Sequence, residues 1–248
     1  MKKKDLSPIR MDQLGFSQRE FLYLFILKQL TAGDSYPKLI HQQLRASFPE
    51  KVHSYDYLCK VAKQMAQEGL VDLSLDHRKH ILTLTEKGAS FLQAHRSESA
   101  ERLKEVLKVV DRFVKDLTGS GTTTPVVHQL SEEHRSFFSK LVSVKDLVRY
   151  ITLKEAMLHT EIYMSEIRSL LQETFGWEAS NGYLYVLASE MEETGLVTGR
   201  WESDKRSRRF LRITDEGTYH YKQIADSSRE RLLQIQKFLN RILYLLEE

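Results

Sequence analysis

The sequence predicts a mainly α-helical protein with small β-hairpins, built as two tandem copies of one domain. Three observations lead to this prediction. Two short motifs, at 65–71 and 82–88, recur in the same order at 191–197 and 211–217. The spacing between copies is 126 residues at the first glycine of each pair (195 − 69) and 129 at the second (217 − 88). Helical patterns precede each pair of motifs, and one long amphipathic stretch follows it.

Residues 1–16 are predicted to form a basic arm, because three consecutive lysines precede the helix-discouraging Pro8. The first domain is predicted over 17–88. Ser17 is a good cap for its first helix, and Glu20 completes a capping-box pattern. The following residues are apolar on nearly every side of a helix, so this helix is expected at the centre of the domain.

Two more helices and a hairpin complete the first domain. The second helix ends at Pro49, and the third runs from its cap Ser54 to Gly69. Alternation of apolar and polar residues over 71–75 and 81–85 predicts two strands joined by a charged turn. Three helices followed by a hairpin is the order of a winged helix-turn-helix domain.

The second domain is predicted over 143–217 and repeats this order. Its first two helices cover roughly 143–158 and 163–174. Ser180 caps the third helix, and a hairpin follows over about 197–214. The fold predicted for the chain is therefore two tandem winged helix-turn-helix domains.

Long amphipathic helices are predicted after each domain, over 89–117 and 218–248, because apolar residues recur there at steps of three and four. A run of Gly, Ser, Thr and Pro over 118–125 predicts a linker that extends over 118–142. The apolar stripe of each long helix must be buried against another surface, so the two helices are expected to pack as an antiparallel pair. The chain would then be a monomeric pseudo-dimer, and a homodimer through the same helices is the alternative.

Composition predicts a cytoplasmic, nucleoid-associated protein that does not enter a membrane. No apolar run approaches the roughly 18 residues of a membrane-spanning helix, and Cys59 is the single cysteine, which suits a reducing compartment. The net charge is +3, but its distribution is uneven. Residues 1–125 carry 20 Lys and Arg against 15 Asp and Glu, whereas residues 126–248 carry 17 against 19. Local clusters rather than total charge must therefore identify any nucleic-acid surface.

The second copy resembles the PadR family of bacterial transcriptional regulators. The residues that carry the resemblance are the run Ser-Asn-Gly-Tyr-Leu-Tyr at 180–185, the motif at 191–197 and the run from Arg208 to Gly217. The resemblance covers roughly 145–247, including a long C-terminal helix of the kind this family uses to dimerise. The first copy resembles the family less and is also similar to winged-helix replication terminator proteins. The resemblance implies a regulator, most simply a repressor, that binds double-stranded DNA.

In a winged helix the third helix enters the major groove, and the wing lies against the DNA backbone or the minor groove. The candidate DNA-binding residues of the third helices and wings are Ser54, Tyr55, Tyr57, Lys60, Lys63, Arg78 and Lys79 in the first copy and Ser180, Asn181, Tyr183, Lys205, Arg206, Arg208 and Arg209 in the second. No Lys or Arg lies between Ser180 and Glu193. The second copy is therefore expected to bind mainly through its wing. Tyr57 and Tyr183 occupy matching positions, so a shared packing role is an equal alternative for them.

Catalytic and metal-binding motifs are not found. The glycine-rich run at 119–123 lacks the Gly-Lys-Ser/Thr ending of a phosphate loop, and His77 and His80 lie in a turn without a nearby cysteine pair. We expect neither an enzyme nor a dependence on a cofactor or metal. Three alternatives stay open: a small-molecule effector, a role as a replication-termination or DNA-segregation roadblock, and a winged-helix module that binds protein.

Overall fold

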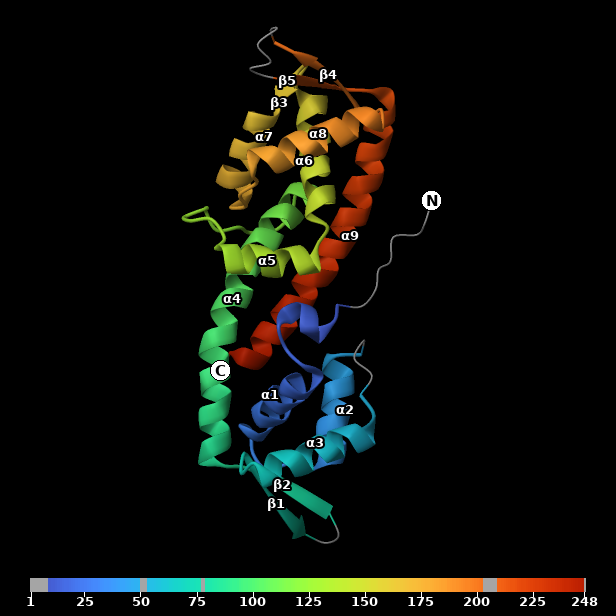
Figure 1. Cartoon of the computed structure of the whole chain (residues 1–248). Helices are drawn as coiled ribbons and strands as arrows, with labels where there is room; N and C mark the ends of the chain where they lie inside the picture. Colours follow the sequence, from blue (N-terminus) through green and yellow to red (C-terminus); the bar gives the residue numbers. More distant parts are fainter. Residues whose placement is uncertain (1–8, 50–52, 77–78, 203–208, 248) are drawn as a thin grey trace. The chain divides into compact units, whose positions relative to one another are not determined.

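The computed structural model describes residues 9–49, 53–76, 79–202 and 209–247, and it divides into two compact units (Figure 1). We call Ser7–Lys104 with Lys237–Glu248 the N-terminal unit, and Glu105–Gln236 the C-terminal unit. The division falls inside the two long helices, α4 (Glu86–Thr118) and α9 (Asp215–Leu246). Each long helix therefore supplies buried residues to both units, whereas the sequence pattern predicts them as elements separate from the two domains.

The N-terminal unit contains the three helices and the hairpin that the sequence predicts. Its elements before α4 are η1 (Met11–Leu14), α1 (Gln18–Leu30), α2 (Pro37–Ser47), α3 (Tyr55–Gln67), β1 (Val71–Asp76) and β2 (Lys79–Leu84). The capping box of α1 is confirmed, because the Ser17 hydroxyl accepts from the Glu20 N–H (3.1 Å) and the Glu20 carboxylate accepts from the Ser17 N–H (2.7 Å). Helix α1 is buried from Phe21 to Leu27 and forms the centre of this unit.

Part of the predicted basic arm belongs to the core of the N-terminal unit. Residues 1–8 lie outside the described residues. Ile9 and Phe16 are buried, and the short turn η1 lies between them. The sequence predicts a loose arm over all of 1–16, and this is wrong for its described end, because these two apolar side chains gain free energy by leaving water.

The C-terminal unit repeats the order of the N-terminal unit with one added helix and one added strand. Its elements are α5 (Glu132–Leu141), α6 (Val144–Leu158), β3 (Ile162–Tyr163), α7 (Met164–Leu170) with the π-helical turn η2 (Leu171–Phe175), α8 (Asn181–Glu193), β4 (Val197–Trp201) and β5 (Arg209–Ile213). The strand order is β3-β5-β4, with both pairings antiparallel. Ile162 pairs with Leu211 in this sheet, and in the N-terminal unit Ser35 forms a bridge with Leu82 at the matching place.

The segment predicted as a linker contains helix α5. Ser131 caps it by accepting a hydrogen bond from the His134 N–H (3.2 Å). Phe137, Phe138 and Leu141 on one face are buried. The prediction of a linker over 118–142 is therefore wrong for 132–141, because three large apolar side chains there pack into the core of the unit.

A threonine fixes the end of the hairpin to the start of the next helix in the same way in both units. The Thr85 hydroxyl donates to the Gly69 carbonyl oxygen (2.8 Å) and accepts from the Gly88 N–H (3.0 Å). In the C-terminal unit the Thr214 hydroxyl donates to the Gly195 carbonyl oxygen (2.6 Å) and accepts from the Gly217 N–H (3.0 Å). The repeated glycines of the sequence therefore belong to one repeated hydrogen-bonded corner.

Gly217 is required at this corner because a Cβ atom built there would lie 2.0 Å from the Leu196 carbonyl oxygen. We expect Gly217→Ala to lower the free energy of unfolding by about 3 kcal/mol, since the backbone must shift to admit the methyl group. Gly182→Ala is the matched control, because nothing lies within 4 Å of its Cβ position and alanine favours helix. Chemical denaturation measures both variants, and equal stabilities would contradict this explanation.

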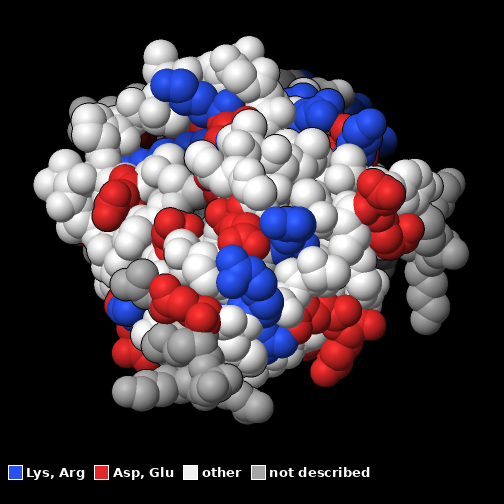
Figure 2. Space-filling model, turned by 90° about the horizontal axis from the view of Figure 1, so that it is seen from above, with Lys and Arg blue, Asp and Glu red and all other residues white. Residues whose placement is uncertain are grey.

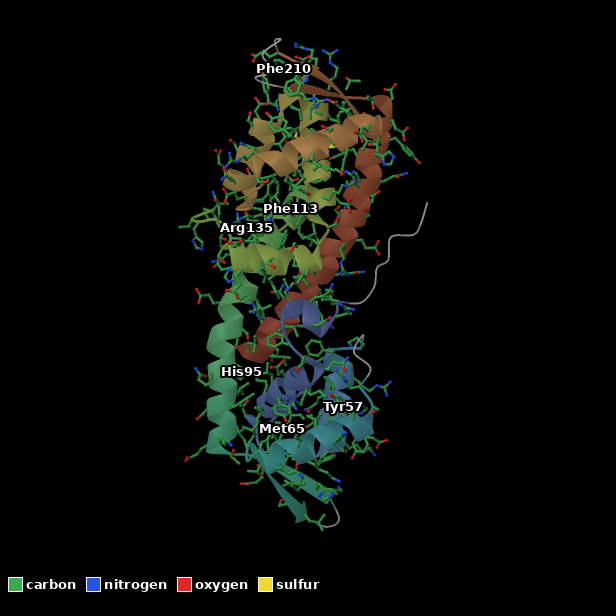
Figure 3. The ribbon with its side chains drawn as sticks, viewed as in Figure 1. Tyr57, Met65, His95, Phe113, Arg135 and Phe210 are labelled. Atoms are coloured by element: carbon green, nitrogen blue, oxygen red, sulfur yellow. The ribbon has the colours of Figure 1, made fainter. Side chains whose placement is uncertain are left out.

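The long helices contribute to each core separately. In the C-terminal unit the ring of Phe113 on α4 stacks on Phe175 with centroids 4.1 Å apart (Figure 3). There the Gln236 amide of α9 also donates to the Asp111 carboxylate (2.7 Å). In the N-terminal unit Lys104 forms an ion pair with Glu247 (2.9 Å). Within the described residues, no helix combines the length and the apolarity that crossing a membrane requires.

Candidate nucleic-acid interface

Helix α3 presents two lysines to solvent. The Ser54 hydroxyl caps this helix by accepting from the Tyr57 N–H (3.2 Å). The buried stripe of the helix consists of Leu58, Val61, Ala62 and Met65. Because this stripe faces the core, Lys60 and Lys63 lie on the opposite, exposed side.

Four exposed cations on α2 and α3 make no ion pair among the described residues: Lys38, Arg45, Lys60 and Lys63. We call them the α2–α3 cations. Their charge is not neutralised by any described carboxylate, so it is available to an anionic partner such as a phosphate backbone.

The start of α3 is held by aromatic contacts with the preceding residues. The Tyr55 ring lies edge-on to His41 at 5.7 Å, and a hydrogen bond with Cys59 raises the pKa of Tyr55. His41 Nε2 contacts the His53 carbonyl oxygen (2.8 Å). Tyr57 stacks on His53 at 6.1 Å and is half-buried (Figure 3). Ser54 and Tyr55 are exposed, whereas the geometry favours a packing role for Tyr57.

In the wing of the N-terminal unit the structure describes only one of the two candidate residues. Lys79 is exposed on β2, and its ammonium group lies 5.6 Å from the centroid of the Tyr36 ring. Arg78 lies outside the described residues.

Helix α8 presents a neutral surface. The Ser180 hydroxyl caps it by accepting from the Tyr183 N–H (3.2 Å). Asn181, Tyr185 and Val186 are exposed over its first two turns. Tyr183 is half-buried, and this burial raises the pKa of its hydroxyl group. The charged side chains of Arg149 and Glu190 lie nearby. Asn181 thus faces solvent as predicted, whereas Tyr183 is turned towards the body of the unit.

The described arginines of the C-terminal hairpin are paired with carboxylates from the body of the unit. Glu161 accepts two hydrogen bonds from Arg200 (3.1 and 2.6 Å), which lower the pKa of this carboxyl group, and it also accepts one from Arg212 (3.4 Å). Arg209 forms an ion pair with Glu192 and lies over the Trp201 ring. These ion pairs could not be predicted from the sequence, because the carboxylates lie 17 to 51 residues from their partners along the chain.

The candidate residues Lys205, Arg206 and Arg208 lie outside the described residues, so of the four predicted residues of this wing the structure describes Arg209. The side chain of Arg209 is 20% exposed and already engaged, which gives it a structural role at the end of the hairpin next to the turn, where it pairs with Trp201. Figure 2 shows the face that lies uppermost in Figure 1. There Lys and Arg atoms lie beside Asp and Glu atoms and form no continuous positive patch among the coloured residues.

Arg168 is a further candidate that the sequence does not single out. It lies on α7, and one of its terminal nitrogens approaches the Asn181 side-chain oxygen (3.5 Å). Glu178 pairs with Arg168 (3.7 Å) and with Arg135 (2.8 Å; Figure 3). Arg168 stands 127 residues after His41, a spacing that many matching positions of the two copies share, so that spacing could have identified it.

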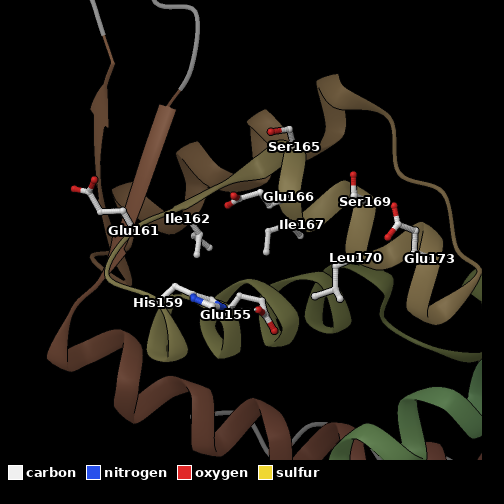
Figure 4. Close-up of a pocket in the computed structure, with 10 residues that line it drawn as sticks. All are labelled: Glu155, His159, Glu161, Ile162, Ser165, Glu166, Ile167, Ser169, Leu170 and Glu173. Atoms are coloured by element: carbon white, nitrogen blue, oxygen red, sulfur yellow. Dashed lines mark ion pairs between the residues drawn. The ribbon is translucent and has the colours of Figure 1, made fainter.

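A pocket of about 530 Å³ lies between the end of α6, β3 and α7 (Figure 4). Several carboxylates line it, and the structure describes partners for three of them. Glu161 holds the hairpin arginines, Glu166 accepts from the Tyr163 N–H (2.9 Å), and Glu155 pairs with His159 (3.5 Å). Among the described residues, no group of three His, Cys, Asp or Glu side chains is arranged to hold a metal ion.

Residues 155–223 match the model of the transcriptional regulator PadR-like family. This segment runs from the end of α6 through α8 and the hairpin into α9, so part of the C-terminal unit is similar to the PadR-like family. The resemblance predicted over 145–247 is confirmed for this part. The likeness of the first copy to the family and to replication terminator proteins stays a prediction.

No curated protein matches the chain. Among solved structures, Bacillus subtilis PadR in complex with operator DNA is similar at 15% sequence identity, over 92% of this chain and 99% of that chain, with a TM-score of 0.29. A TM-score this low carries no argument about this chain. The match to the family model is therefore the finding on which the functional argument rests.

Proposed function

We propose that the protein is a transcriptional repressor that binds double-stranded DNA through two winged helix-turn-helix domains in tandem. The observation that carries the proposal is the match of 155–223 to a family of transcriptional regulators, since this segment contains α8 and its hairpin. The N-terminal unit supports a second such domain, because it has the same element order and the same threonine corner. Helices α3 and α8 then enter the major groove, and the hairpins lie along the backbone.

The α2–α3 cations favour DNA as the partner of the N-terminal unit. A duplex carries one phosphate charge for roughly each 1.7 Å of its length, and unpaired lysines and arginines release its counterions on binding. Lys60 and Lys63 are three residues apart and thus one turn apart on one helix face. They contact phosphates or the acceptor edge of guanine.

In this proposal the chain is a covalent pseudo-dimer whose long helices take the place of a dimer interface. Two contacts support an antiparallel pairing of α9 with α4. Gln236 contacts Asp111 in the C-terminal unit, and Glu247 contacts Lys104 in the N-terminal unit. Light scattering should give the mass of one chain, 29.0 kDa. Twice that mass would mean that the chains themselves pair.

The absence of Lys and Arg from α8 favours a protein partner as the second candidate function. No cation lies between Ser180 and Glu193, and Glu190 and Glu192 are both bound to cations of the same unit. Selection of duplexes from a random pool by the purified chain, followed by titration at several salt concentrations, separates the two functions. Selection of one sequence with a salt-dependent affinity supports the regulator. Absence of binding to any duplex at low salt would contradict the regulator and favour a function in binding a protein partner.

Glu161 limits the contribution of the hairpin to DNA binding in this proposal. Glu161→Gln releases Arg200 and Arg212, so we expect tighter binding and a slope of log affinity against log salt that is steeper by up to about 1.8. Glu155→Gln is the matched control, because it removes one nearby negative charge that pairs with His159 instead. Fluorescence anisotropy at several salt concentrations measures both variants. Equal effects of the two substitutions would show that net charge alone is responsible.

A further inference from the structure

The exposed faces of α3 and α8 differ chemically at matching positions. Lys60 and Val186 each stand six residues after the serine that caps their helix, and both are exposed. The side chain at this position is a cation in one unit and an aliphatic group, 60% exposed, in the other. Val186 is therefore an aliphatic side chain that its helix turns mostly towards solvent.

The neighbours of Val186 keep its surroundings neutral. On the same face Tyr185 is 38% exposed, and Asn181 and Gly182 are open to solvent. Two described cations border this face, and each is bound to a carboxylate. Arg168 donates to the Asn181 side-chain oxygen (3.5 Å) and pairs with Glu178 (3.7 Å), and Arg209 approaches the Ser189 hydroxyl (3.5 Å) and is bound to Glu192. The exposed face of α8 therefore offers apolar contact and a single amide, and it offers no free charge among the described residues.

This difference determines which base each helix reads, provided that the proposed function holds. In the major groove, thymine presents a methyl group that aliphatic side chains contact, whereas guanine presents two acceptors that lysine contacts. We propose that α8 recognises a half-site through a thymine methyl group against Val186, and that α3 recognises a different half-site through guanine against Lys60. The operator is then chemically asymmetric, one half depending on thymine methyl groups and the other on guanine.

Removing the methyl group from the DNA tests the proposal without changing the protein. Deoxyuridine differs from thymidine only by this methyl group, and the loss of one buried methyl corresponds to roughly a fourfold weaker affinity. The duplex selected by the intact chain is resynthesised with deoxyuridine in place of each thymidine in turn. A second series replaces each guanine by 7-deazaguanine, which lacks the N7 acceptor.

The proposal predicts that the effects of deoxyuridine and of 7-deazaguanine on affinity depend on different residues of the protein. The intact chain should lose about fourfold in affinity at one or more thymines of one half-site, and Val186→Ala should abolish that loss. Lys60→Gln should abolish the sensitivity to 7-deazaguanine and leave the deoxyuridine sensitivity unchanged. Val127→Ala, at a residue that is 87% exposed outside the third helices, is the matched control and should preserve both.

Two results would overturn the proposal and leave the function intact. One is specific binding by the intact chain that no deoxyuridine substitution weakens, and the other is a Val186→Ala variant that retains the full loss. Failure of the intact chain to bind any duplex would instead overturn the function itself, and the assignment of bases with it. Exposed Val186 contributes little to folding, and circular dichroism verifies that Val186→Ala has the helix content of the intact chain.

Discussion

Replacement of Phe113 by alanine is expected to lower the free energy of unfolding by about 4 kcal/mol, because it leaves a cavity in the core of the C-terminal unit. Phe113 is 1% exposed. Its ring stacks on Phe175 at 4.1 Å and lies 6.4 Å from Phe138 on α5. The residue thus joins α4, α5 and the π-helical turn before α8, and denaturation with urea measures the loss.

Tyr219→Ala is the matched control for this prediction. Tyr219 is an aromatic residue of the same unit, but it is 59% exposed, so its loss should change the free energy of unfolding by no more than about 0.5 kcal/mol. If Phe113→Ala cost no more than Tyr219→Ala, then the end of α4 would not belong to this core. The division of the chain inside the long helices would then be wrong.

Replacement of both Lys60 and Lys63 by glutamine is expected to weaken DNA binding at least tenfold at physiological salt. Each lysine that neutralises a phosphate contributes about 0.9 to the slope of log affinity against log salt, so the slope should fall by up to about 1.8. The substitution should leave stability unchanged, because both side chains are exposed and form no ion pair among the described residues. Titrations at four or more salt concentrations measure the slope.

The control for this prediction is the pair Lys115→Gln and Lys222→Gln, which changes the net charge by the same amount at exposed positions outside α2 and α3. This control pair should leave the slope close to that of the intact chain. If both pairs lowered the slope equally, the effect would come from total charge, and α3 would not be placed against the duplex.

The sequence predicts the starts of three helices, α1, α3 and α8, well because their signals are local. Ser17, Ser54 and Ser180 cap the helices that the pattern predicts, and each does so through a hydrogen bond to a residue three positions later. The repeated Gly69 and Gly195 follow the residues that cap the ends of the third helices, with positive φ angles of 73° and 72°. Such features depend on a few neighbouring residues and can be read without tertiary information.

The features that the sequence does not predict depend on contacts between distant residues. Helix α5 is missed because a glycine- and threonine-rich run precedes it and its apolar face gains stability only from the core. The pairing of the described hairpin arginines with carboxylates is missed because Glu161 and Glu192 lie in other elements. The role of the candidate residues of α3 and α8 in DNA binding therefore stays a prediction, and the pairing of Arg200, Arg209 and Arg212 with carboxylates is what the sequence pattern misses.

Hydroxyl-radical footprinting of the selected duplex tests most directly whether one chain binds DNA through two third helices. The intact chain should protect two separate tracts of the backbone. Lys60→Gln with Lys63→Gln should weaken protection in one tract, and Asn181→Ala with Val186→Ala should weaken it in the other. A single protected tract, or two tracts that respond to the same pair of substitutions, would contradict the account.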